Sequence, residues 1–260
     1  MPSFDQTPDK PVSFGYKVRW FAVKTSDPAG VLDALEFGNG IPANWASGLA
    51  AADPSVASRI ASPGSAPWVF ISPAVNGWVL IVSGSFPYPV APTERVNEFR
   101  ADIGEKFDVP FSRLMTRFAD VQFFGNHRVG GFTAWARAQA GEPRRVFTFA
   151  DGVLANVGAQ TPEEASLKFA NLSGLTASAA EEKFLEIAQR RVAERSALEA
   201  SGLSPREAIK ISSQNNRGVP DETDVVDLAG LWSIDPTHLS DQDHPPGFGL
   251  AVRLPEGLKV

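Results

Sequence analysis

Residues 67–84, PWVFISPAVNGWVLIVSG, constrain the fold more than any other segment of this chain. Two nearly continuous apolar runs flank Asn76 and Gly77, a dipeptide that adopts the positive φ angles of a type I′ turn. The pattern predicts a β-hairpin. Strands this apolar are typically buried on both faces. We therefore expect the hairpin to lie centrally in a sheet, with Val79 and Ile81 in the core.

A second group of short apolar runs lies between residues 120 and 158. Turn residues separate the runs, notably at 140–143 and 151–152, so the pattern predicts an antiparallel meander. Strand alternation places Phe132, Ala134, Ala136 and Ala138 on one face, and Thr133, Trp135, Arg137 and Gln139 on the other. We expect the alanine face to lie under a helix and the mixed face to reach solvent or a groove.

Helix signals alternate with these strands. Apolar residues at helical spacing predict a helix over 92–107 with Thr93 as its cap, and a second short helical face over 111–118. Asp27 followed by Pro28 predicts another helix start. Capping boxes begin at Thr161, Ser178 and Ser204, and Asp221 is a further cap. The helix over about 179–200 is expected to turn Phe184, Leu185, Ala188 and Val192 inward.

These elements define an α+β fold: a mainly antiparallel sheet with a central hairpin and a meander, and helices packed on it. The first strand is expected over 16–23 and the last over 247–254. The segment 39–67 is rich in small residues and is expected to be a loop or a loosely helical excursion, with Trp45 as its large anchor. Residues 1–13 are predicted to be a flexible tail, and residues 14–260 a single α+β domain.

Composition excludes several classes of protein. No apolar run approaches the roughly 18 residues of a membrane span, and the net charge of −6 disfavours a broad nucleic-acid surface. The N-terminus lacks the basic and apolar regions of a secretory signal. The chain has no cysteine, so disulfides and thiolate chemistry are absent. We expect a soluble cytoplasmic protein with no cofactor, no nucleic-acid partner and no membrane association.

The motifs of common enzyme classes are missing from the sequence. It has no GxSxG, no GxxxxGK[ST], no GxGxxG after a strand and no HExxH. Motif absence does not exclude activity. Whether the chain is an enzyme therefore stays open, with a non-catalytic protein favoured and no catalytic residue assigned.

One loop is a candidate small-molecule site. Asn126, His127 and Arg128 lie between two meander strands, near Trp135 and Arg137 in the sequence. An arginine presents a fork of donors that suits a carboxylate or phosphate. The simpler alternative is a solvated turn. If the loop binds a small anion, His127, Arg128 and Trp135 should line one concave pocket.

The segment His238–His244 could offer two imidazoles and two carboxylates to a metal. Its spacing matches no standard zinc pattern, so we expect no metal site there. Trp232 and Asp235 follow the last predicted helix and are candidate partner-binding residues, because tryptophan is a favoured interface anchor. The alternative is that Trp232 closes the core under the helix end.

Three segments carry a resemblance: GWVLIVSG at 77–84, FADVQFFGNHRVGGFTAWARAQAG at 118–141 and DETDVVDLAGLWSIDP at 221–236. Together they resemble uncharacterised bacterial cytosolic proteins, some of which are suspected immunity proteins. The resemblance implies a non-catalytic, protein-binding protein, an immunity-type antagonist of a bacterial toxin. An acidic chain suits a basic toxin through complementary steering. The alternative is a metal-independent enzyme or a small anionic ligand binder with its site near His127 and Arg128.

Overall fold

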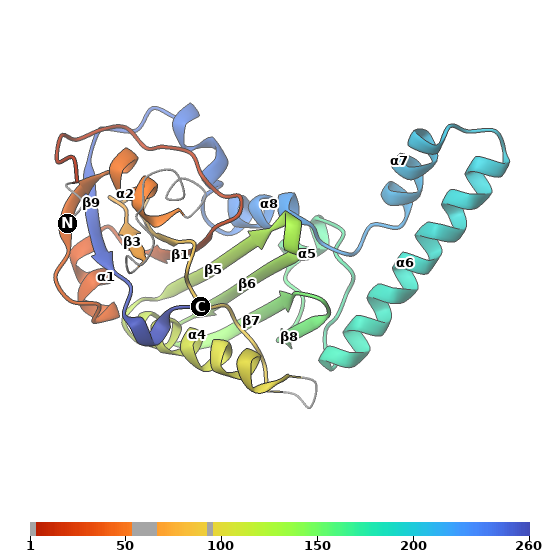
Figure 1. The fold of residues 1–260 in the computed structure, drawn as a ribbon, viewed down its shortest axis with the longest axis horizontal. Coiled ribbons are helices and arrows are strands. Elements are labelled where there is room, and N and C mark those ends of the chain that lie inside the picture. Colours follow the sequence, from red (N-terminus) through yellow and green to blue (C-terminus); the bar gives the residue numbers. More distant parts are fainter. Residues whose placement is uncertain (1–3, 54–66, 93–95) are drawn as a thin grey trace.

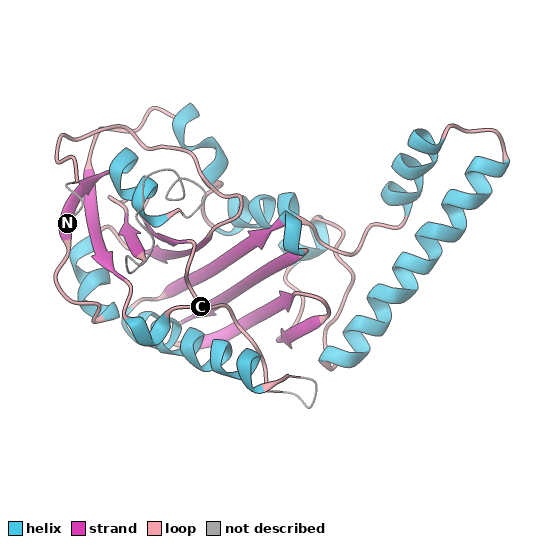
Figure 2. Ribbon diagram, in the orientation of Figure 1, coloured by secondary structure: helices cyan, strands magenta, loops and turns pink. Residues whose placement is uncertain are grey.

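The computed structural model describes residues 4–53, 67–92 and 96–260, and their strands form one antiparallel sheet (Figures 1 and 2). The nine described strands lie in the order β2-β9-β3-β4-β1-β5-β6-β7-β8. Their bounds are β1 (Arg19–Lys24), β2 (Ile41–Asn44), β3 (Trp68–Ile71), β4 (Trp78–Ser83), β5 (Asp120–His127), β6 (Phe132–Gln139), β7 (Glu142–Phe149), β8 (Val153–Val157) and β9 (Phe248–Arg253).

The described helices pack on both faces of this sheet, except for one pair that projects from it. They are α1 (Pro28–Leu35), α2 (Trp45–Ala52), α4 (Glu98–Arg117), α5 (Pro162–Ser166), α6 (Ala177–Ala200), α7 (Pro205–Asn215) and α8 (Glu222–Trp232). Short 3-10 turns are η1 (Arg128–Gly130), η2 (Pro236–Asp241) and η3 (Glu256–Leu258). This arrangement confirms the predicted α+β class.

The central hairpin forms as predicted. Val75 and Trp78 exchange both backbone hydrogen bonds, at 2.8 and 2.9 Å. Between them Asn76 and Gly77 have φ angles of 51° and 79°, the signature of a type I′ turn. Strands β3 and β4 are the third and fourth of the nine and have neighbours on both sides. Val79 and Ile81 are fully buried.

The two faces of the sheet carry separate apolar cores. The alanine face of β6 lies in one core with Phe107, Phe111 and Leu114 of α4, so the prediction of a covering helix is confirmed. The opposite face is buried too, under α2, α8 and the segment around Phe169 and Leu172. The expectation that this mixed face reaches solvent or a groove is wrong at Trp135, which is 1% exposed.

Several boundaries differ from the sequence predictions. Within 39–67, residues 41–52 form β2 and α2, and Asn44 caps α2 by accepting a hydrogen bond from the Ser47 N–H at 3.0 Å. Trp45 is buried, as expected of an anchor. The two helical stretches between 92 and 118 form the single helix α4, which is capped by Asn97 and contains Pro110. The proposed cap Thr93 lies outside the described residues.

The helix starts at Asp27, Thr161, Ser204 and Asp221 are confirmed by side-chain caps in the structure. Helix α6 is capped by Thr176 instead of the predicted Ser178. Within the described parts of the chain, no helix combines the length and the apolar character that crossing a membrane requires.

The described part of the predicted tail, residues 4–13, lies against the body. The Asp9 carboxylate accepts hydrogen bonds from the Trp45 and Ala46 N–H groups at 2.7 and 3.0 Å, at the start of α2. Asp9 also forms a β-bridge with Gly247. These contacts hold the segment in place, which differs from the flexible tail expected over 1–13.

Candidate functional site

In the loop at residues 126–131, residues 127–131 are exposed to solvent. Asn126 is buried, and its amide donates to the Gly15 carbonyl at 2.6 Å while its oxygen accepts from the Lys17 N–H at 2.9 Å. Asn126 thus fixes the chain before β1. The His127 Nδ1 accepts from the Gly130 N–H at 3.3 Å and so caps η1. A small anion would meet an exposed turn here.

The other residues of the predicted ligand site point elsewhere. The Arg128 side chain is 80% exposed and lies 3.6 Å from a Glu222 oxygen of α8. Trp135 is buried and donates from Nε1 to Glu164 at 3.0 Å. Arg137 forms an ion pair with Asp120 at 2.7 Å. The structure therefore separates the buried Trp135 and the half-buried Arg137 from the exposed His127 and Arg128, and the polar contacts of these side chains are made with different partners.

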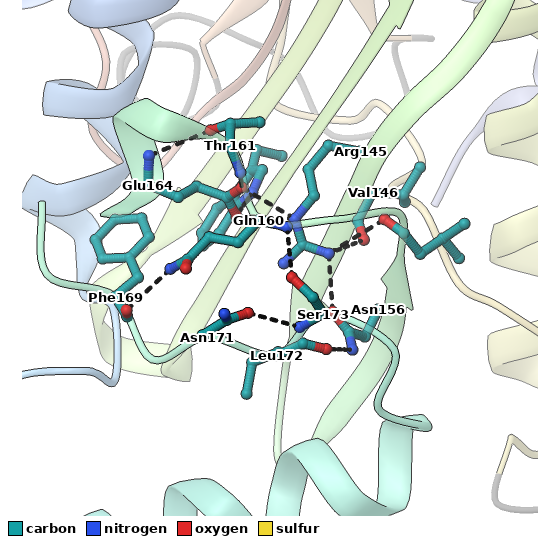
Figure 3. A network of polar contacts seen from close by, with 12 residues as sticks. Arg145, Val146, Asn156, Gln160, Thr161, Glu164, Phe169, Asn171, Leu172 and Ser173 are labelled. Atoms are coloured by element: carbon teal, nitrogen blue, oxygen red, sulfur yellow. Dashed lines mark hydrogen bonds and ion pairs between the residues drawn. The ribbon is translucent and has the colours of Figure 1, made fainter. Parts of the chain in front are cut away.

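A buried polar network holds the segment that leads into α6 (Figure 3). Arg145 and Glu164 are 3% and 1% exposed, and Arg145 Nε lies 2.9 Å from Glu164 Oε1. Arg145 also donates to Asn156 Oδ1 at 2.8 Å, and the Asn156 amide donates to the Leu172 and Leu175 carbonyls, both at 2.9 Å. The pair is satisfied on all sides, so we assign it a structural role.

The same network fixes the α5 end of that segment. Glu164 Oε2 accepts from the Thr161 N–H at 2.7 Å, which completes a capping box. The Gln160 side chain donates to the Phe169 carbonyl at 2.9 Å, and the Gln160 backbone N–H donates to the Ser173 hydroxyl, also at 2.9 Å (Figure 3). Hydrogen bonds therefore hold residues 160–175, up to the residue that precedes the α6 cap Thr176.

Trp232, a predicted partner-binding residue, lies in the core instead. It is 5% exposed, its ring lies 5.7 Å from that of Phe124, and the Arg137 guanidinium stands 5.4 Å from its centre. A side chain this buried does not present an edge to a partner. Asp235, the other predicted residue, is half-buried and accepts from the Thr237 N–H at 2.8 Å, which caps η2.

The segment around Asp235 is nonetheless rich in acidic residues, of which Glu222 and Asp224 are paired with Arg128 and Arg217. Residues 221–243 contain seven acidic side chains and no lysine or arginine. Burial, followed by the neighbouring Asp224 and Asp235 carboxylates, raises the pKa of Asp227. Burial also raises the pKa of Asp224, against the opposing hydrogen bonds from Asp221 and Arg217. Leu231, four residues after Asp227 on α8, is 50% exposed.

The histidine cluster forms a surface turn. His238 Nδ1 lies 2.8 Å from an Asp241 oxygen, and this hydrogen bond is the first cause that raises the pKa of His238. His244 contacts Gln242. Over residues 4–53, 67–92 and 96–260, no group of three or more histidine, aspartate or glutamate side chains is arranged to hold a metal ion.

The most distinctive surface is the pair α6 and α7, which projects from the β8 end of the sheet (Figure 1). We call residues 177–215 the arm. Its two helices pack against each other, and Ala208 and Ser212 of α7 are buried. The Arg191 guanidinium donates to the Asn216 carbonyl at 3.0 Å, and Glu194 accepts from the Asn215 and Asn216 amides. These contacts occupy one face of α6.

The opposite face of α6 carries exposed apolar side chains. Leu185 and Val192 are 56% and 64% exposed, so the expectation that they point inward is wrong. The reason is helix geometry. Glu194 contacts Asn215 of α7, and two residues from Glu194 is about 200° around a helix, which places Val192, and Leu185 seven residues before it, away from α7. Leu185, Ala188 and Val192, at positions i, i+3 and i+7, define the outer stripe of the arm.

Comparisons with protein-family models, with curated proteins and with solved structures found no match to this chain. The arm could have been identified from the sequence only in part. The apolar spacing on α6 is visible, but which apolar residues face α7 depends on where α7 packs. The function is therefore inferred from the surfaces of this molecule.

Proposed function

We propose that this chain acts by binding another protein, and that the outer stripe of the arm is its contact surface. The observation that carries the proposal is the exposure of Leu185 and Val192 on a 24-residue helix held rigidly at its root. Exposed apolar side chains at i, i+3 and i+7 are the anchors by which an amphipathic helix enters a hydrophobic groove. The expected partner offers such a groove.

The rigidity of the root supports this proposal. The Arg145–Glu164 network fixes residues 160–175. The Ala170 N–H donates to the Gly218 carbonyl at 2.9 Å, which links the segment before the arm to the segment after it. A helix positioned in advance loses less conformational freedom on binding than a flexible one. The arm is therefore suited to presenting its stripe to a partner.

Charge distribution indicates the kind of partner. The arm contains six acidic and six basic side chains, so the net charge of −6 resides in the rest of the chain. Residues 216–221 connect the arm to α8, where the acidic segment 221–243 begins. We propose that this segment steers a basic protein and that the outer stripe supplies apolar contact. A basic toxin, with this chain as its immunity-type antagonist, fits both features.

The test compares a double variant of the outer stripe with a single control variant on α7. Both replace exposed apolar residues with serine. Leu185→Ser/Val192→Ser removes the stripe, and Ile209→Ser changes an exposed apolar residue of α7 that is 46% exposed. A partner captured by the wild type is purified and its Kd measured by calorimetry with each variant. We expect the double variant to bind at least about 30-fold more weakly, as for two hot-spot side chains, and Ile209→Ser to bind like the wild type. Equal affinities for all three proteins would refute the proposal.

A further inference from the structure

A cavity lies between residues 12–18 and α2, on the opposite side of the sheet from α4. Its volume is about 520 Å³. Most of its lining is apolar and includes Val12, Phe14, Val18, Leu49 and Val82, and the polar side chains Ser13, Asp53 and Thr237 complete it. Cavities of roughly 300–1,000 Å³ with mostly apolar walls are typical of small-molecule sites. Val12 and Tyr16, which also line the cavity, are 37% and 45% exposed and leave apolar surface open to solvent.

The walls of this cavity are fixed by polar contacts that do not depend on what fills it. The Phe14 N–H donates to the Pro236 carbonyl at 3.0 Å, and the Ser13 N–H donates to the Ser240 hydroxyl at 2.9 Å. On the other side of the segment, Asn126 holds Gly15 and Lys17. Because these bonds hold residues 13–17 at a set position, the wall is prevented from collapsing onto α2.

Gly15 shows how closely the segment is fitted. Its φ is 128°, and an added Cβ would lie 3.1 Å from both the Pro236 and the Thr237 side chains. The chain thus passes tightly against η2 on its outer side while leaving space on its inner side. The opposite wall is equally fixed, because the Asp9 carboxylate and Asn44 both cap α2.

We propose that this cavity is a binding site for a small, uncharged, largely apolar molecule with an alkyl or aryl body. The lining favours such a ligand because apolar walls make few hydrogen bonds with water, so water is displaced from them readily. Charged ligands are disfavoured because a charge loses its hydration among apolar side chains. The preformed wall lowers the ordering cost of binding. The site is separate from the arm and does not depend on the protein-binding proposal.

The test uses the neutral fluorescent probe N-phenyl-1-naphthylamine with the full chain. We expect saturable binding that 1-decanol displaces and that decanoate and decylamine displace at least about tenfold less well. In addition, Ala50→Phe fills the lining from α2, whereas Ala50→Ser at the same position preserves its volume. We expect the first variant to weaken probe binding by at least about tenfold and the second to leave it within about threefold.

A second measurement keeps the test decisive if Ala50→Phe fails to fold. In wild-type protein with labelled methyl groups, the probe should shift the methyl NMR signals of Leu49 and Val82, which line the cavity, and leave those of Leu185 and Val192 on the arm unchanged. Absence of saturable binding, shifts only at the arm, or preferential displacement by decanoate or decylamine would each overturn the proposal.

Discussion

The central sheet and the arm use similar apolar residues in opposite ways. In the sheet, Ile81 of β4 is fully buried in the core that it shares with residues of α1 and α4. On α6, Leu185 and Val192 are more than half exposed, because α7 packs against the side that carries Glu194. The difference indicates that apolar residues of the sheet contribute to the stability of the fold. Those of the outer stripe contribute little to it and are available for a partner.

The largest effect should come from the root of the arm. Glu164→Gln removes one charge of the buried pair and leaves Arg145 uncompensated, which is expected to lower the free energy of unfolding by about 3–5 kcal/mol. Glu163→Gln, on the adjacent and more exposed residue, is the control and should change it by less than about 0.5 kcal/mol. Urea unfolding measures both. Equal, small losses would show that the root is not held by this network.

The next effect should arise in the sheet. Ile81→Ala leaves a cavity at a fully buried position and should cost about 2–5 kcal/mol in urea unfolding. Leu185→Ala, a comparable truncation on the outer stripe, should cost less than about 0.5 kcal/mol in the same experiment. A loss above this at Leu185 would mean that the stripe packs against the body in solution.

A smaller effect concerns pH. Since burial and the Asp224 and Asp235 carboxylates raise the pKa of Asp227 in the folded protein, the folded state binds its proton more tightly than the unfolded state. The resulting stability is present below the unfolded pKa of 3.8 and is lost as pH rises through the folded value. Asp227→Asn should therefore raise stability at pH 7, by less than about 1 kcal/mol because the side chain is partly solvated. A lower stability at pH 7 would contradict this assignment.

The same comparison shows what the sequence could predict. The hairpin at Asn76-Gly77, the alternation along 132–139 and the caps at Asp27, Thr161, Ser204 and Asp221 are local patterns, and the structure confirms them. Burial of Trp135 and exposure of Leu185 depend on which distant segment covers each face. Such pairings are set by tertiary packing, and local periodicity does not contain them.

The candidate site illustrates the same limit. Asn126 and Arg128 are two residues apart in sequence, yet one is buried against Gly15 and the other extends toward Glu222. The Arg145–Glu164 pair joins residues 19 positions apart. Sequence patterns identified the capping role of Glu164, but its contact with Arg145 requires β7 and α5 to meet on one face of the sheet.

Photo-crosslinking from the arm tests the central claim most directly. A benzophenone side chain is placed at Val192 on the outer stripe or, as a control, at Gln214, an exposed polar residue of α7. The account predicts a crosslinked product with one protein partner from position 192, with a much lower yield from position 214. Equal yields from both positions, or no product from position 192, would contradict the assignment of the outer stripe as a protein-binding surface.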